Sequence, residues 1–300
     1  MFSNGVLEQI GNTPIVRLTP STGANIFAKA EYLNPGGSIK DRIALFMIDD
    51  AIKRGVLKEG TIIAEPTSGN TGIGISLVGG LMGFRVIIAM PENMSQERRK
   101  IIRALGAELI LTPAEESVEG AIKKINEIKE TYENVFIPNQ FENPANPLAH
   151  YITTGPEIWM QLGRNVDIFV SGLGSGGTLQ GVGKFLKERN PATRIVAVEP
   201  KNVSALLGHE PGLHRIEGIG DGFIPPVLDI SIIDEVIEVE DDDAVETSRL
   251  LARKSGLLVG TSSGANVWAA MQMAKKYGNQ KVIATILADR AERYFSTSLI

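Results

Sequence analysis

Short apolar runs alternate with segments in which apolar residues recur every three or four positions, and this alternation covers nearly the whole chain. The apolar runs predict strands at residues 60–66, 84–91, 107–113, 134–140, 166–172, 193–200, 235–239 and 281–289. Periodic segments between them, such as 95–106 and 117–132, predict helices. Strands that alternate with helices form parallel sheets, and continuous apolar runs are typical of sheets covered on both faces. The pattern therefore predicts an α/β fold with two doubly wound, mostly parallel sheets.

Two irregular segments interrupt this alternation. Residues 139–150 are rich in Asn and Pro, which favour turns, and we expect the boundary between two domains there. Residues 199–226 lie inside the second half and are too long for an ordinary connection. Long loops within a compact domain tend to shape binding sites, so this segment is expected to border one. A further strand-like run, 256–260, precedes a glycine-containing turn rich in hydroxyl groups and then another predicted helix, within the segment GLLVGTSSGAN from Gly256 to Asn266.

Lys40 stands in the first turn of a predicted helix, where Ser38 can accept a hydrogen bond from the backbone N–H two or three residues on. Counting by three and four from Lys40 gives the apolar residues Ile43, Ala44, Met47 and Ala51. A helix N-terminus and an apolar setting both disfavour an ammonium ion, so this amine is pushed toward its neutral form. A neutral lysine can form a Schiff base, whereas the alternative is a side chain that reaches water beside Asp41.

Two glycine-rich turns each follow a predicted strand and open a predicted helix, the arrangement that binds anions at the carboxyl edge of a sheet. The turn from Glu65 to Gly72, EPTSGNTG, offers hydroxyl and backbone donors that suit a carboxylate. The turn from Ser171 to Gly181, SGLGSGGTLQG, adds the hydroxyls of Ser175 and Thr178, which suit a terminal phosphate monoester. Together with Lys40, the turns point to an amino-acid substrate held on pyridoxal phosphate.

The same turn also fits a different cofactor. Gly172, Gly174 and Gly177 match the dinucleotide pattern, and Glu199 ends the next predicted strand, where an acid would bind ribose. This predicts, as an alternative, a nicotinamide-dependent oxidoreductase. The spacing to Glu199 is longer than the usual value of about 20 residues, which weakens that alternative.

The composition and net charge of the chain exclude several classes of binding partner and catalytic site. The 300 residues are 43% hydrophobic and carry a net charge of -5, which argues against nucleic acid or an anionic membrane as a partner. The absence of cysteine excludes disulfides, thiolate metal sites and a nucleophilic thiol. The three histidines, His150, His209 and His214, are not spaced as metal ligands on one helix face. No signal peptide or membrane span is predicted, and a cytoplasmic location is expected.

Several motifs, in order along the chain, resemble those of one enzyme family. They are IGNTPIVRL, NPGGSIKDR, EPTSGNTGI, QFENPANPLAHYITTGPEIW, GLGSGGTLQGV, GLLVGTSSGAN and DRAERYFST. They are similar to the cysteine synthase (O-acetylserine sulfhydrylase) and cystathionine β-synthase family of fold-type II pyridoxal-phosphate enzymes, which share the fold of the tryptophan synthase β subunit. The resemblance implies a smaller domain over 35–145 and a larger, cofactor-binding domain over 1–34 and 146–300.

The resemblance also implies residue roles. Lys40 would bind the cofactor covalently and later move the Cα proton, Asn70 would bind the oxygen on the cofactor ring, and Ser262 would face its pyridine nitrogen. The phosphate would be held by Gly174, Ser175, Gly176, Gly177 and Thr178. The amino-acid substrate would be bound by Thr67, Ser68, Asn70, Thr71, Gln140 and Gly218. The implied reaction is β-replacement through an aminoacrylate, from O-acetylserine and sulfide to cysteine and acetate.

Asp221 departs from the family pattern, in which cysteine synthases have alanine and cystathionine β-synthases an aromatic residue. A carboxylate here would repel bisulfide, and it could orient a thiol leaving group or activate water. The alternative function is therefore the use of cysteine as substrate, with release of hydrogen sulfide and formation of serine, lanthionine or cystathionine. A turn-capping role for Asp221 is equally compatible with the sequence.

The family resemblance finally suggests partners. It implies a homodimer and leaves open an association with serine acetyltransferase.

Overall fold

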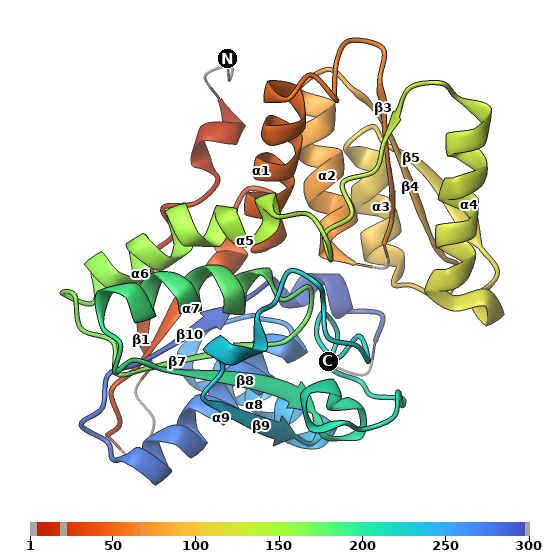
Figure 1. Cartoon of the computed structure of the whole chain (residues 1–300). Helices are drawn as coiled ribbons and strands as arrows, with labels where there is room; N and C mark the ends of the chain where they lie inside the picture. Colours follow the sequence, from red (N-terminus) through yellow and green to blue (C-terminus); the bar gives the residue numbers. More distant parts are fainter. Residues whose placement is uncertain (1–4, 19–22, 68, 298–300) are drawn as a thin grey trace.

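The computed structural model describes residues 5–18, 23–67 and 69–297, which form two separate sheets (Figure 1). The larger sheet has the strand order β1-β2-β10-β7-β8-β9, and the smaller has the order β5-β4-β3-β6. All pairs of neighbouring strands are parallel except β1 and β2. The strands are β1 (Ile15–Leu18), β2 (Ile26–Ala30), β3 (Ile62–Pro66), β4 (Arg85–Pro91), β5 (Glu108–Thr112), β6 (Val135–Phe136), β7 (Ile168–Gly172), β8 (Arg194–Pro200), β9 (Glu235–Val239) and β10 (Ile283–Leu287).

Helices cover both faces of each sheet. The α-helices of the described residues are α1 (Lys40–Lys53), α2 (Asn70–Leu81), α3 (Gln96–Ala104), α4 (Ser117–Thr131), α5 (Ala145–Ala149), α6 (Gly155–Gln161), α7 (Gly177–Arg189), α8 (Asp241–Ser255) and α9 (Thr261–Tyr277). In Figure 1, α6 and α7 lie on one side of the larger sheet and α8 and α9 on the other. One face of the smaller sheet packs against α1, α2 and α3, and the other against α4. The predicted α/β architecture with doubly covered, mostly parallel sheets is confirmed.

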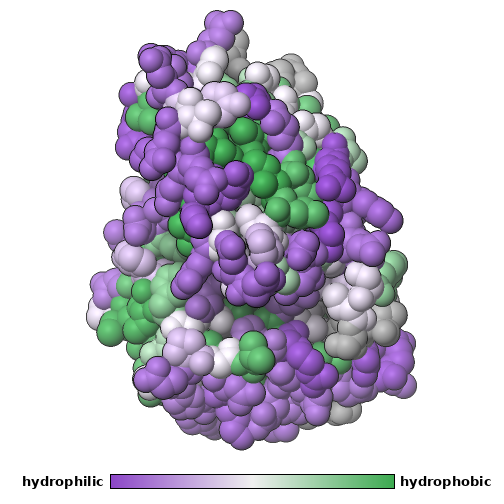
Figure 2. Space-filling model, turned by 90° about the vertical axis from the view of Figure 1, so that its right-hand side faces the viewer, coloured by the Kyte–Doolittle hydropathy of each residue, from purple (hydrophilic) through white to green (hydrophobic). Residues whose placement is uncertain are grey.

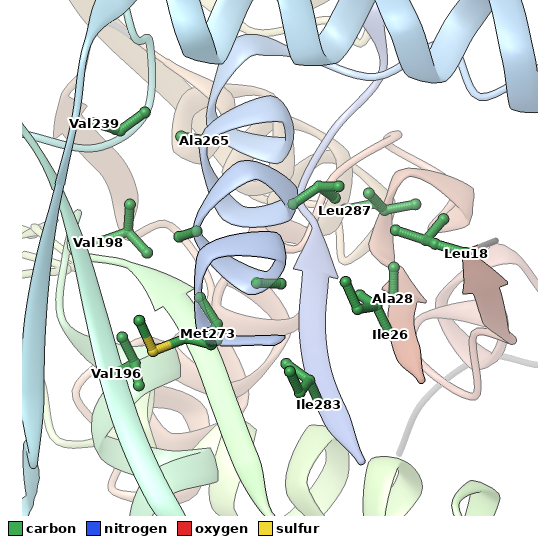
Figure 3. Close-up of a cluster of buried hydrophobic side chains, with 14 of the residues drawn as sticks. Leu18, Ile26, Ala28, Val196, Val198, Val239, Ala265, Met273, Ile283 and Leu287 are labelled. Carbon is green, nitrogen blue, oxygen red and sulfur yellow. The ribbon is translucent and has the colours of Figure 1, made fainter. Parts of the chain in front are cut away.

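Burial on both faces explains the continuous apolar runs. In β8, Val196 and Val198 point into the cluster that includes α9, while Ile195 and Ala197 point into the cluster beneath α7. Figure 3 shows the first of these clusters, in which side chains of β10, β2 and β8 surround Met273 and Ala265 of α9. A strand with core on both sides needs apolar residues at successive positions, so regular alternation of apolar and polar residues is absent.

The strand predictions were wrong at three places. β1 and β2 were not predicted, because each contains a charged residue that interrupts its apolar run, Arg17 in β1 and Lys29 in β2. Lys29 is fully buried and forms an ion pair of 2.7 Å with Glu157. The run 256–260 is not a strand: it follows the left-handed Gly256 at the end of α8 and makes one isolated bridge, from Val259 to Arg290. Its apolar residues Leu257 and Val259 instead pack into the core between α8 and α9.

A buried charged cluster joins α1 to the larger sheet. Arg42 donates to Glu31 Oε1 and to Glu157 Oε1, each at 2.7 Å, and Thr13 donates to Glu31 Oε1 at 2.6 Å. The Arg42 guanidinium holds the pKa of Glu31 at about 2, although burial alone would raise it. Because Arg42 lies two residues after Lys40, this cluster fixes the start of α1 relative to β2.

The face of the molecule on the side of the smaller sheet is mostly polar. Figure 2 shows a largely hydrophilic face with an apolar area in its upper half, beside the smaller sheet. None of the described helices combines the length and apolar character needed to cross a membrane. The uncharged run from Pro66 to Phe84, which could suggest a span, holds the loop after β3 and the helix α2.

Candidate active site

Lys40 begins α1, and its helix stripe is buried as predicted. Ser38 Oγ accepts a hydrogen bond of 3.2 Å from the Lys40 N–H, although the helix itself begins one residue later than a serine cap would place it. The residues that share the stripe, Ile43, Ala44, Met47 and Ala51, are fully buried. Lys40 is half-buried and lines a cavity between the two sheets. The stripe therefore packs inward while the amine at its end faces a cavity instead of bulk water.

The surroundings of Lys40 favour the neutral amine. Burial lowers the pKa of Lys40 below its ordinary value, while the negative charges of Asp221 and Asp289 act in the opposite direction. An amine that loses its proton more readily is a better nucleophile toward a carbonyl carbon.

The cavity around Lys40 has two adjoining parts, and the residues predicted from the sequence line them. The first part is lined by Lys40, Thr67, Asn70, Thr71, Gln140, Ser175, Gly218, Asp221 and Ser262. The second part is lined by Lys40, Gly174, Ser175, Gly176, Thr178, Gly218 and Ser262. Gly177 lies between two residues of the second part, and Ser68 lies outside the described residues. Three glycine-rich turns, far apart in the sequence, thus converge on one lysine.

The turn before α7 fits a phosphate group. Gly176 has φ of 79°, which suits glycine, and a Cβ on Gly177 would lie 1.8 Å from Asn146 Oδ1. The two glycines therefore leave the backbone at the start of α7 uncovered, and the first N–H groups of α7, which have no acceptor within the helix, are available to a ligand in the cavity. Asn146 Nδ2 donates to Ser175 Oγ at 3.1 Å and so positions that hydroxyl. A cradle of N–H and hydroxyl donors matches the three oxygens of a phosphate monoester.

The loop between β3 and α2 forms the opposite wall. Thr71 Oγ1 donates to Gln140 Oε1 at 2.7 Å, and Thr67 Oγ1 accepts from the Gly69 N–H at 3.2 Å. The buried Glu65, at the end of β3, accepts from the Asn139 N–H at 3.1 Å and holds the segment that carries Gln140. Burial raises the pKa of Glu65 to about 7. The wall thus presents amide and hydroxyl donors near Lys40, as a carboxylate requires.

Comparison with known proteins agrees with this geometry. Residues 6–289 match the model of the family described as pyridoxal-phosphate dependent enzyme. The chain is 50% identical to a cysteine synthase of Staphylococcus aureus, over 99% of this chain and 96% of that protein. The chain belongs to the cysteine synthase family of pyridoxal-phosphate enzymes. This decides against the nicotinamide alternative and confirms the predicted cofactor.

Solved structures of family members share the fold. A cysteine synthase of Entamoeba histolytica superposes with a TM-score of 0.95 and 42% identity, covering 100% of this chain and 91% of that one. A hydrogen sulfide-producing enzyme of Fusobacterium nucleatum superposes with a TM-score of 0.94 and 41% identity, covering 98% and 100% of the two chains.

Asp221, the residue that departs from the family pattern, lies at the cavity that holds Lys40. Its carboxylate lines the same part of the cavity as Lys40 and keeps access to water. Burial by the surrounding protein raises the pKa of Asp221, and the positive charge of Lys40 opposes that shift. His214 accepts from the Ile216 N–H at Nδ1, so its Nε2 donates to the Gly220 carbonyl at 3.0 Å. His214 thereby helps to hold the loop that carries Asp221.

Sequence reasoning missed several residues around the cavity. Arg98 of α3 is buried and forms an ion pair with Glu217, and both line the cavity with Lys40. His150 Nε2 lies 3.4 Å from Thr178 Oγ1, and burial lowers the pKa of His150 to about 3, so this imidazole is neutral. Asp289 and Arg293 form hydrogen bonds with Asn70, and Tyr294 donates to Asp289. Asp289, Arg293 and Tyr294 belong to the motif DRAERYFST, which supported the family resemblance, but no role was assigned to them from the sequence.

No group of three or more His, Asp and Glu side chains among the described residues is placed to hold a metal ion.

Proposed function

We propose that this chain is a cysteine synthase, which converts O-acetylserine and sulfide to cysteine and acetate. The observation that carries the proposal is one cavity in which Lys40, a phosphate cradle and a carboxylate-binding wall meet. The 50% identity to the Staphylococcus aureus cysteine synthase supports this choice of reaction. Pyridoxal phosphate, when bound, supplies the electron withdrawal that lets a proton leave Cα and a substituent leave Cβ.

Each wall of the cavity has a proposed task. Gly174, Ser175, Gly176, Gly177 and Thr178 would hold the cofactor phosphate, with Asn70 and Ser262 at its ring. Thr67, Ser68, Thr71 and Gln140 would hold the substrate carboxylate, and Gly218 would border it. Lys40 would bind the cofactor and hold at Nζ the proton taken from Cα. The Ser262 hydroxyl is neutral, so it cannot stabilise a positive ring nitrogen as a carboxylate would, which favours rapid loss of the β substituent.

The test is formation of cysteine from O-acetylserine and sulfide by the purified protein. We expect turnover that requires pyridoxal phosphate. A protein that binds pyridoxal phosphate but forms no cysteine from O-acetylserine and sulfide would contradict this proposal.

A second function is favoured by the carboxylate of Asp221, which lines the cavity beside Lys40. It is the release of hydrogen sulfide from cysteine: the Cβ–S bond breaks, and water adds at Cβ to give serine. The similarity to the hydrogen sulfide-producing enzyme of Fusobacterium nucleatum supports this candidate. Asp221 would act as general base on the incoming water, and with an amino thiol in place of water the product would be lanthionine or cystathionine.

Comparison of the two reactions in wild type and Asp221→Ala separates the candidates. If Asp221 directs the chain toward cysteine as substrate, the variant loses sulfide release and gains cysteine formation. Wild type without detectable sulfide release would contradict the second function and leave the first.

We also propose the domain division at 35–145 and a homodimer, both from the family resemblance. Light scattering of the purified protein tests the dimer. Co-elution with a serine acetyltransferase tests the proposed partner.

A further inference from the structure

The Asn70 side chain is held at both ends by residues from the last part of the chain. Its Nδ2 donates to Asp289 Oδ2 at 2.6 Å, and its Oδ1 accepts from Arg293 Nη1 at 2.5 Å. Asp289 and Arg293 are both buried, with 1% and 3% of their surfaces exposed. Asn70 begins α2, more than 200 residues earlier, so this contact joins α2 to the segment after β10.

The partners determine which way the amide points. An arginine can only donate hydrogen bonds and a carboxylate can only accept them, so Oδ1 must face Arg293 and Nδ2 must face Asp289. The χ2 torsion of asparagine has a broad, two-fold preference, so the amide would otherwise turn over easily. With both partners in place, the second N–H of Nδ2 remains as the donor that Asn70 can offer to the cavity.

The segment that carries these two residues also holds the backbone before Lys40. Arg293 Nη2 donates to the Gly36 carbonyl, in the loop before Lys40. Ala288, next to Asp289, accepts a backbone hydrogen bond of 2.9 Å from Ile39, the residue directly before Lys40. Tyr294 donates to Asp289 Oδ2, which leaves this carboxylate little freedom to move. The segment 288–294 therefore sets the relative position of Lys40 and Asn70.

We propose that Asp289 and Arg293 are positioning residues, which orient the Asn70 amide as a hydrogen-bond donor toward the cofactor ring. This inference rests on the proposed role of Asn70 in cofactor binding. Neither Asp289 nor Arg293 is among the residues that line the two parts of the cavity. Their effect on the orientation of the Asn70 amide must vanish when that amide is absent, so their total effect on cofactor binding must become smaller in Asn70→Ala.

A double-mutant cycle tests this dependence. Arg293→Gln is made in wild type and in Asn70→Ala, and the affinity of each apoprotein for pyridoxal phosphate is measured by absorbance titration. We expect about tenfold weaker binding from Arg293→Gln in wild type and a clearly smaller loss in Asn70→Ala, where only the contact of Arg293 with the Gly36 carbonyl remains to be lost. Arg290→Gln is the matched control, because Arg290 lies in the same segment and donates to Tyr32 instead, at 2.9 Å. It should leave the affinity unchanged in both backgrounds.

Two further measurements separate orientation from folding. Thermal unfolding of the apoproteins reports whether Arg293→Gln folds, and if it does not, Asp289→Asn takes its place in the same cycle. The position of the visible band of the bound cofactor should shift in Arg293→Gln and stay unchanged in Arg290→Gln. Equal losses of affinity in both backgrounds would overturn the inference. A wild type that binds no pyridoxal phosphate would instead overturn the proposed function itself.

Discussion

Thr71 and Gln140 meet through a hydrogen bond of 2.7 Å from Thr71 Oγ1 to Gln140 Oε1, although they are separated by 69 positions along the chain. The bond occupies the oxygen of the Gln140 amide and turns its NH2 group into the donor for a ligand. The pair thus gives this wall of the cavity an amide N–H donor that suits a carboxylate.

Gln140→Glu should therefore weaken binding of the amino-acid substrate. The new carboxylate would repel the substrate carboxylate, and we expect KM to rise by about 10- to 100-fold with a smaller change in kcat. Steady-state kinetics with O-acetylserine measure this. Gln272→Glu in α9 adds the same charge away from the cavity and should leave KM unchanged. An unaltered KM in Gln140→Glu would exclude this residue from the carboxylate site.

Lys40→Ala should remove both the covalent attachment of pyridoxal phosphate and catalysis. We expect an almost colourless protein and a loss of turnover of about 10³-fold or more, since no other amine takes the proton from Cα. A visible absorbance scan and the cysteine assay measure the two effects. Lys53→Ala, at the exposed end of the same helix, has 71% of its side chain exposed and should behave as wild type. A yellow, active Lys40→Ala protein would refute the assignment.

Glu65 should make the protein less stable as the pH rises. Its pKa is about 7 in the folded chain against an ordinary 4.5, because burial disfavours the charged form. The folded chain therefore binds the proton of Glu65 more tightly than the unfolded chain does. The contribution of this bound proton to the free energy of unfolding is complete below pH 4.5 and is lost as the pH rises through 7. The loss is about 3 kcal/mol at most. Asp41, whose pKa burial also raises to about 7, acts in the same direction.

Urea unfolding at several pH values checks this effect. Glu65→Gln should flatten the fall in the free energy of unfolding between pH 5 and pH 8, and Glu65→Gln with Asp41→Asn should flatten it further. Glu133→Gln, on the exposed surface, is the matched control. A pH dependence that is the same in wild type and in Glu65→Gln would show that Glu65 titrates normally.

The ion pair of Arg98 with Glu217 should stabilise the contact between α3 and the loop that carries Gly218 and Asp221. Arg98 is buried, and its Cζ lies 4.9 Å from the centroid of the Tyr294 ring in a cation–π contact. Loss of the Glu217 charge therefore leaves a buried guanidinium that is poorly compensated. We expect Glu217→Gln to lower the free energy of unfolding by about 1–2 kcal/mol. Glu246→Gln breaks an exposed pair with Arg253 and should cost less than about 0.5 kcal/mol. Equal effects of the two substitutions would contradict this prediction.

The α/β class, eight of the strands and the glycine-rich turns could be predicted because they depend on neighbours in sequence. A strand buried on both faces needs a continuous apolar run, as in β8, and a turn before a helix needs small residues, as at Gly176. Lys40 and its stripe followed from helical spacing alone, since Ile43, Ala44, Met47 and Ala51 must share one side of α1.

Tertiary structure decided what depends on partners distant in sequence. β2 tolerates Lys29 because Glu157 reaches it from α6, and the run 256–260 becomes a connection because α8 ends at Gly256. The orientation of Asn70 depends on Asp289 and Arg293, which lie more than 200 residues away. Spacing along a chain determines which side chains share a face, whereas the charge and hydrogen-bond partners that a buried polar group requires are supplied only when the sheets have packed.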